Sequence, residues 1–250
     1  MNILLAGEQW TSVGVEVKGF DYFGVSSYHE GSRWLIEALQ SHDHHVDHLR
    51  SFDVPRMFPE QLEQLSQYDV LILSDIGSNS LLFHPEVLVQ SICHPNRLKL
   101  IRDYVAQGGG LLMIGGWMSF QGIDGRARYH RTPIEEVLPV LCEPNDDRVE
   151  CPEGITPEVV NAAHPVLAGI TGRWPVFLGY NLTTLKPEAE SLVTIEGDPF
   201  IATQRYGKGR TAAFTSDCAP HWGPPEFLEW PYYGLLWHNL VEWLGDHSHS

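Results

Sequence analysis

Asp217 and His221 are the pair of side chains in this sequence best suited to acid–base chemistry. They lie four residues apart in a segment that also contains Pro220, Trp222 and Pro224, a composition typical of a preorganised polar site. An imidazole can accept a proton near neutral pH, and a neighbouring carboxylate can orient the ring. We therefore expect His221 to act as a base that Asp217 orients. In the alternative reading, Asp217 only caps a turn, and His221 packs with Trp222 under the last helix.

Other polar groups follow apolar stretches that read as buried strands. These stretches are residues 3–6, 70–73 and 111–114, and their uninterrupted apolar character is typical of parallel strands covered on both faces. A further strand is expected over residues 210–214, after the hairpin connection Gly207-Lys208-Gly209. Ligands of such sheets bind beyond the carboxyl ends of the strands. The residues expected at these ends are Glu8, Gln9, Asp75, Gly77, Ser78, Trp117, Ser119, Asp217 and His221.

The elements that must position these residues alternate between strand and helix in the first half of the chain. Apolar residues recur at helical intervals over residues 34–39 and 98–105, and Ser27 and Glu30 have the spacing of a capping box before the first helix. This alternation predicts an α/β fold with a doubly wound, mostly parallel sheet. From about residue 131 short strand-like pieces predict an antiparallel β extension, and residues 233–244 form a terminal helix with a broad apolar stripe.

Two long segments look like functional loops. Residues 11–28 are rich in aromatic side chains, which argues against disorder and predicts a lid over the site or a subunit contact. Residues 120–130 contain Arg126 and Arg128, whose guanidinium groups could meet an acidic ligand. The simpler reading of these cations is solvation of an acidic surface.

Several motifs make the chain similar to a known superfamily. Gly115-Gly116-Trp117-Met118-Ser119 resembles the strand-to-helix elbow Gly-x-Cys-x-Gly of the class I glutamine amidotransferases, with Trp117 at the cysteine position and Ser119 at the second glycine. The whole chain is most similar to a bacterial family of uncharacterised glutamine amidotransferases. The motifs that carry this second resemblance are Lys18-Gly19-Phe20-Asp21, Ser74-Asp75-Ile76-Gly77, residues 119–125, Thr215-Ser216-Asp217-Cys218 and His221-Trp222-Gly223.

The resemblance implies a flavodoxin-like sheet and a single amidotransferase-like domain over residues 1–250. It also implies an oxyanion loop near Asp75 to Ser78. Glutamine hydrolysis by the amidotransferase route needs a thiolate, a histidine and an acid. The elbow lacks the thiol, and an indole is not a nucleophile, so a standard glutaminase is not expected. Cys218 follows Asp217, whose carboxylate disfavours a thiolate, and Ser119 is the remaining hydroxyl candidate.

The composition of the chain excludes several classes of binding partner. The chain of 250 residues has a formal net charge of -16, which repels nucleic acids and anionic membranes. It has no apolar run long enough to span a bilayer and no secretory leader pattern, so we expect a cytoplasmic protein.

The four cysteines form no C-x-x-C pair, and the run Asp43-His44-His45-Val46-Asp47-His48 places no three ligands on one strand face. We therefore expect no metal and no cofactor. The alternative is a weak divalent-cation site formed by His221 with carboxylates.

Two functions are consistent with these residues. The first is a hydrolase without a cysteine nucleophile, acting on a small polar substrate with His221 and Asp217, Ser119 being a further catalytic candidate. Backbone N–H groups near Gly77 and Gly116 would bind a developing anion. The second is a noncatalytic protein that binds a small ligand or assembles as a homo-oligomer on the same scaffold. The expected ligand-binding residues are Glu8, Asp75, Gly77, Ser78, Gly116, Trp117 and Trp222.

Overall fold

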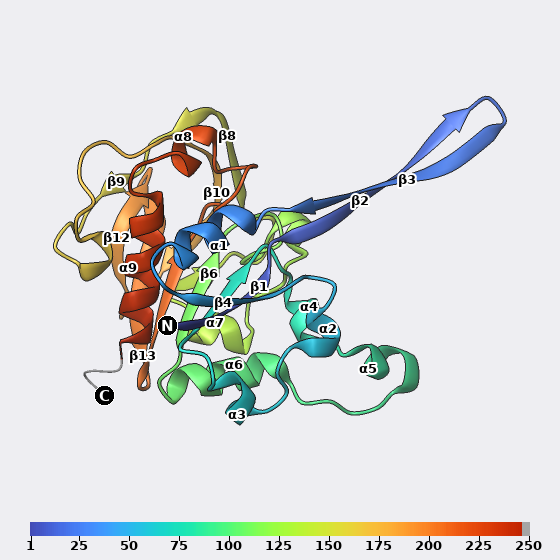
Figure 1. Ribbon diagram of the computed structural model, residues 1–250, viewed down its shortest axis with the longest axis horizontal. Helices are drawn as coiled ribbons and strands as arrows, with labels where there is room; N and C mark the ends of the chain where they lie inside the picture. The colour runs from blue at the N-terminus through green and yellow to red at the C-terminus, as the bar shows by residue number, and fades with distance from the viewer. Residues whose placement is uncertain (247–250) are drawn as a thin grey trace.

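The computed structural model describes residues 1–246 and is built around an eight-stranded sheet (Figure 1). The strand order across the sheet is β4-β1-β5-β6-β14-β13-β12-β9. The strands are β1 (Asn2–Gly7), β4 (His45–Leu49), β5 (Val70–Ser74), β6 (Gly110–Ile114), β9 (Glu158–Val159), β12 (Glu190–Ile195), β13 (Asp198–Tyr206) and β14 (Gly209–Phe214).

The parallel half of the sheet confirms the predicted fold class. β1 pairs in parallel with β4 and β5, and β6 pairs in parallel with β5 and β14. In chain order these five strands run 2-1-3-4-5, which is the flavodoxin-like arrangement. The order reverses beside β1, so the crevice expected to receive a ligand lies at the carboxyl ends of β1 and β5.

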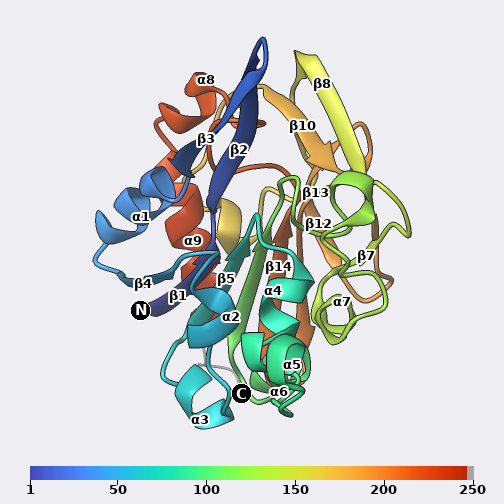
Figure 2. The ribbon, with the colours of Figure 1, turned by 90° about the vertical axis from the view of Figure 1, so that its right-hand side faces the viewer.

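Helices cover both faces of the parallel strands because alternate strand residues point to opposite sides. Ile3 and Leu5 pack in the core with α1 (Arg33–Gln40) and α9 (Tyr233–Gly245), whereas Leu4 and Ala6 pack with α6 (Arg97–Ala106). Figure 2 shows the two helical layers on either side of the strands. The other helices are α2 (Val54–Met57), α3 (Leu62–Leu65), α4 (Ser78–Leu82), α5 (Pro85–Gln90), α7 (Pro133–Val137) and α8 (Pro225–Leu228).

The second half of the chain supplies the predicted antiparallel extension. β13 and β14 form a hairpin, and β12 and β9 continue the sheet in antiparallel pairing. Two small sheets lie beside it: β8 (Arg148–Ile155) with β10 (Phe177–Asn181), and β7 (Val140–Cys142) with β11 (Thr183–Leu185).

Residues 11–28 are not a loop, contrary to the sequence prediction. They form the long hairpin of β2 (Gln9–Lys18) and β3 (Asp21–Glu30), which projects from the body as an arm (Figure 1). Ser27 and Glu30 lie within β3 and cap no helix; α1 follows Ser32, which makes no side-chain capping bond. Their spacing is that of a capping box, but Ser27 pairs with Ser12 and Glu30 pairs with Gln9 across the two strands of the hairpin.

Over residues 1–246, none of the helices is long and apolar enough to cross a membrane. The sequence after the last helix is polar and predicts a tail that contains His247 and His249, and both histidines lie outside the described residues.

Candidate functional site

The carboxyl ends of β1, β5, β6 and β14 meet around a cavity of about 390 Å³. The structure thus brings together five of the residues expected at strand ends, namely Glu8, Asp75, Trp117, Asp217 and His221. The residues lining the cavity are Glu8, Trp10, Ser12, Asp75, Trp117, Met118, Ile123, Asp217, Pro220 and His221.

Three of the polar residues in this cavity have backbone conformations that non-glycine residues rarely adopt. Their φ angles are 56° at Glu8, 42° at Asp75 and 153° at His221. Such conformations cost on the order of 1–3 kcal/mol each and occur preferentially at functional sites. The surrounding fold therefore holds these side chains in place against an intrinsic backbone preference.

Glu8 is the most enclosed acid of the cavity. Its carboxylate accepts a hydrogen bond of 2.5 Å from the Ser74 hydroxyl, and its side chain is fully covered. Burial raises the pKa of Glu8 well above its ordinary value, and the nearby carboxylates of Asp217 and Asp75 raise it further. Burial also raises the pKa of Asp217, with Asp75 adding to the effect. The protonated forms of these acids are therefore favoured well above the usual pH range of carboxyl groups.

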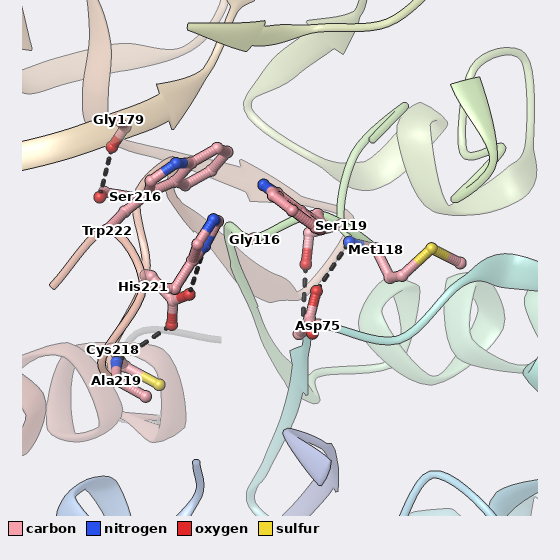
Figure 3. Close-up of polar contacts among 12 residues, drawn as sticks. Asp75, Gly116, Met118, Ser119, Gly179, Ser216, Cys218, Ala219, His221 and Trp222 are labelled. Carbon is pink, nitrogen blue, oxygen red and sulfur yellow. Dashed lines mark hydrogen bonds and ion pairs between the residues drawn. The ribbon is translucent and has the colours of Figure 1, made fainter. Parts of the chain in front are cut away.

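Asp75 forms two hydrogen bonds to the turn that follows β6. Its Oδ1 accepts a hydrogen bond of 2.7 Å from the Met118 backbone N–H, and its own N–H donates to Ser119 Oγ at 3.1 Å (Figure 3). The Ser119 hydroxyl in turn donates to the Ile114 carbonyl at 2.5 Å and is buried. Ser119 is thus placed as a structural link between two strand ends, with its proton directed at a backbone carbonyl and its side chain outside the cavity lining.

His221 lies at the rim, with its Nδ1 3.4 Å from Asp217 Oδ2. One side of its ring stacks on Trp222 at a centroid distance of 4.9 Å, as Figure 3 shows, and the Trp117 ring meets it edge-on at 4.8 Å. Burial lowers the pKa of His221 below its ordinary value of 6.5. The imidazole is therefore neutral at pH 7, with a lone pair available to accept a proton.

Two residues of β8, Arg148 and Glu150, complete this wall, and neither is predicted from the sequence. Glu150 accepts hydrogen bonds from both indole N–H groups, at 3.3 Å from Trp117 and 2.9 Å from Trp222. The Arg148 guanidinium lies 5.4 Å from the centre of the Trp117 ring, within cation–π range. The buried indole of Trp222 requires an acceptor, but only the tertiary fold identifies which carboxylate supplies it.

The elbow after β6 is held from behind by Asn181 and Asp147. Asn181 Oδ1 accepts the Gly116 N–H at 2.9 Å, and its Nδ2 donates to Asp147 Oδ1 at 2.8 Å. Asp147 also accepts the N–H groups of Gln121 and Gly122, and burial raises its pKa to about 6. The Gly116 N–H is consequently engaged within the protein and does not face the cavity as a free donor.

The other predicted ligand-binding positions lie beside or behind the cavity. Gly77 lines a neighbouring depression together with Asp75, and Ser78 is buried and donates to the Ala127 and Arg128 carbonyls. Trp222 is 1% exposed, so it supports His221 from beneath.

Three groups of side chains in the described residues have ligand atoms close enough to hold a metal ion. Only one touches the cavity, namely Glu8, Asp217 and Cys218, whose ligand atoms lie within 4.8 Å of one another. The others are His44 with His238 and Glu242, and His84 with Glu86 and His94. In the group of His44, His238 and Glu242, the two histidines contact each other directly, with 2.9 Å between their ring nitrogens.

None of the four cysteines is placed as an active nucleophile. Cys93 is exposed, and Cys142, Cys151 and Cys218 are buried. Burial and then the carboxylates of Glu8 and Asp217 raise the pKa of Cys218 well above its ordinary value. The thiol nearest the cavity is therefore kept in its unreactive protonated form.

Two solved structures match the whole chain closely. Both are described as cytoplasmic proteins, one from Salmonella typhimurium and one from Salmonella typhimurium LT2. The first is 44% identical with a TM-score of 0.94, and the second is 41% identical with the same TM-score. In each case the match covers 98% of this chain and 99% of the other.

More distant matches share the fold alone. A ThuA-like protein from Bacteroides uniformis is 13% identical, with a TM-score of 0.56 over 97% of this chain and 90% of that one. No curated protein matches the sequence significantly. The family model described as "Putative glutamine amidotransferase" matches residues 2–246, and the chain therefore belongs to this family of glutamine amidotransferase-like proteins.

Proposed function

We propose that this protein is a hydrolase that acts on a small polar substrate without a cysteine nucleophile. The observation that carries the proposal is the placement of His221 Nδ1 3.4 Å from Asp217 Oδ2 at the rim of a cavity that also contains Glu8 and Asp75. The pKa of the histidine is lowered and the pKa values of the acids are raised. Pairs of groups shifted in opposite directions supply a base and an acid at the same pH.

In the proposed reaction, neutral His221 takes a proton from water as the water oxygen bonds to the substrate carbon. Asp217 keeps the imidazole oriented, and protonated Glu8 gives its proton to the leaving group as the old bond breaks. The proton on His221 then returns to Glu8 through solvent, which restores the site. A water nucleophile requires neither Ser119 nor a thiol.

We also infer that Trp117 occupies the position of the amidotransferase cysteine. Its indole forms one wall of the cavity and is 42% exposed. Glu150 and Arg148 hold the ring in place, which suits it to stack on a flat or cyclic part of a substrate. Two similar proteins described as cytoplasmic support a cytoplasmic location for this chain.

The test is a hydrolysis screen of the purified protein against chromogenic esters, amides and glycosides, with ammonia release from L-glutamine followed in parallel. We expect turnover of at least one small polar substrate and no release of ammonia above the uncatalysed rate. Ammonia release from glutamine would contradict the proposal, as would the absence of turnover across the whole panel.

The second candidate is a noncatalytic ligand-binding protein, favoured by the fixed Trp117 ring at the cavity wall. It predicts that amino acids, amides or sugars raise the melting temperature while none of the panel is hydrolysed. It also predicts that Trp117→Ala abolishes that shift. The same screen therefore separates the two functions, because only the hydrolase yields product.

A further inference from the structure

The arm formed by β2 and β3 exposes apolar side chains on a scale that the rest of the surface does not. Half of the large apolar residues exposed in the described part of the chain belong to it, and Phe20 at its tip is 106% exposed. An isolated two-stranded hairpin is marginally stable in water, and both of its outer edges carry unpaired backbone groups. The arm therefore has the properties of a segment that is covered in the working protein.

The apolar residues are distributed unequally between the two faces of the arm. Residues directly opposite in the pairing share a face, and Val15 pairs with Gly24, Val13 with Ser26, and Val17 with Tyr22. This arrangement defines the valine face, consisting of Val13, Val15, Val17, Tyr22 and Tyr28. The opposite face carries Glu16 and, at the root of the arm, the cavity residues Trp10 and Ser12.

The root of the valine face is directed towards a second apolar surface on the body. Thr11 and Val13 line one depression together with Phe52 and Ser80, and a neighbouring depression contains Ser80 with Leu88 and Val89. Phe52, Met57, Leu88 and Val89 are between 56% and 80% exposed, and we call them the α5 patch. Figures 1 and 2 both show α2, α4 and α5 on the side of the body from which the arm projects.

Charge indicates what covers these surfaces. The formal net charge of the chain is -16, yet residues 10–28 contain only Glu16, Lys18 and Asp21 as charged groups. A basic protein would be attracted to the body rather than to this nearly neutral arm, and an anionic membrane would find no cluster of cations on it. A second copy, repelled elsewhere by its own charge, meets little repulsion along the arm.

The available area is also sufficient for a stable dimer. The strands of the arm are ten residues long, which corresponds to about 33 Å. The two exposed tyrosines of the valine face can each bury roughly 150–250 Å², and the three valines of this face and the α5 patch add to that area. The arm therefore offers on the order of the 800 Å² per partner found in standard protein interfaces.

We propose that the arm binds a second copy of this chain. In a two-fold symmetrical dimer, the valine face of each arm lies on the α5 patch of the other copy. This contact is reciprocal, as a two-fold interface requires. It also steadies the root of each arm, where Trp10 and Ser12 form part of the cavity wall.

The test is the mass of the purified protein by light scattering at micromolar concentrations. We expect the wild type to have twice the mass of the chain. Val15→Glu, at the centre of the valine face, is expected to weaken the dimer about 100-fold or more because it places a charge in a desolvated contact. Leu88→Glu should do the same from the receiving side.

Val25→Glu is the matched control, since Val25 is an exposed valine of the same arm whose pairing with Gly14 places it on the opposite face. It should leave the dimer intact. A monomeric wild type would overturn the proposal. So would a Val15→Glu variant that remains dimeric, or equal dissociation by Val15→Glu and Val25→Glu.

Discussion

Replacing His221 with Ala is expected to lower kcat/KM for the best substrate of the screen by about 10²–10⁴-fold, the usual contribution of a general base. The imidazole is the cavity group whose pKa is lowered, so no neighbouring residue takes over its role at neutral pH. His221 lies at the rim, with its side chain 31% exposed. We therefore expect the variant to keep its fold and melting temperature.

Two further measurements separate a chemical role of His221 from a structural one. Added imidazole should restore part of the activity of His221→Ala, because a small base can enter the space left at the rim. Ser119→Ala is the matched control: its hydroxyl donates to the Ile114 carbonyl, so kcat/KM should change by less than about tenfold. A His221→Ala variant with wild-type kcat/KM would remove the histidine from the reaction, and a Ser119→Ala variant that loses as much as His221→Ala would assign nucleophilic catalysis to the serine.

Replacing Glu8 with Gln is expected to act in opposite directions on activity and stability. The amide has the same size and can still accept the Ser74 hydrogen bond, but it cannot deliver a proton. We expect kcat/KM to fall about 10²-fold or more, the usual loss for a general acid. At the same time the melting temperature should rise, because the folded wild type must keep this buried carboxyl group protonated at a pH where the same group is ionised in the unfolded chain.

The raised pKa of Glu8 also predicts how the stability gained by Glu8→Gln changes with pH. The pKa of Glu8 is raised in the folded protein, so its contribution to the free energy of unfolding is most favourable below its unfolded pKa and is lost as the pH rises through its folded pKa. The gain in stability of Glu8→Gln should therefore be larger at pH 9 than at pH 5. Each 1 kcal/mol corresponds to about 2–4 °C in a chain of this size.

The same shifts predict the pH profile of the wild type. Activity should fall on the acid side at a pH below 6.5, where His221 takes up a proton, and on the alkaline side above the usual carboxyl range, where Glu8 loses its proton. The alkaline limb should disappear in Glu8→Gln. Glu37→Gln, the same change at an exposed position of α1, should alter neither limb nor the melting temperature. A Glu8→Gln variant that is less stable at every pH would contradict this description of the carboxyl cluster.

Much of the fold could be predicted from the sequence because the buried parallel strands have an unmistakable signature. β1, β5 and β6 are uninterrupted apolar stretches, and each must end at the same edge of the sheet. Listing the residues just beyond these ends is therefore enough to predict that Glu8, Asp75 and Trp117 lie together, and Asp217 joins them from the end of β14. The predicted role of each residue stays a prediction.

The prediction of a loop over residues 11–28 is wrong for a physical reason. Val13, Val15 and Val17 alternate as strand residues do, but a strand is recognised by the face that it buries, and this hairpin buries neither face in its own chain. The acidic partner of the two indoles was missed for a different reason. Glu150 lies on β8, far along the chain from Trp117 and Trp222, and no local spacing connects them.

We propose that the site works without a thiol, and Cys218→Ala tests this proposal most directly. Cys218 is the cysteine whose sulfur lies with the carboxylates of Glu8 and Asp217, so it is the residue through which a concealed thiol mechanism would have to act. The measurement is kcat/KM of this variant for the best substrate of the screen, compared with the wild type at pH 7. We predict a value within about threefold of the wild type, because burial keeps this thiol protonated. A loss of about 10²-fold or more in a folded variant would contradict a mechanism without a thiol.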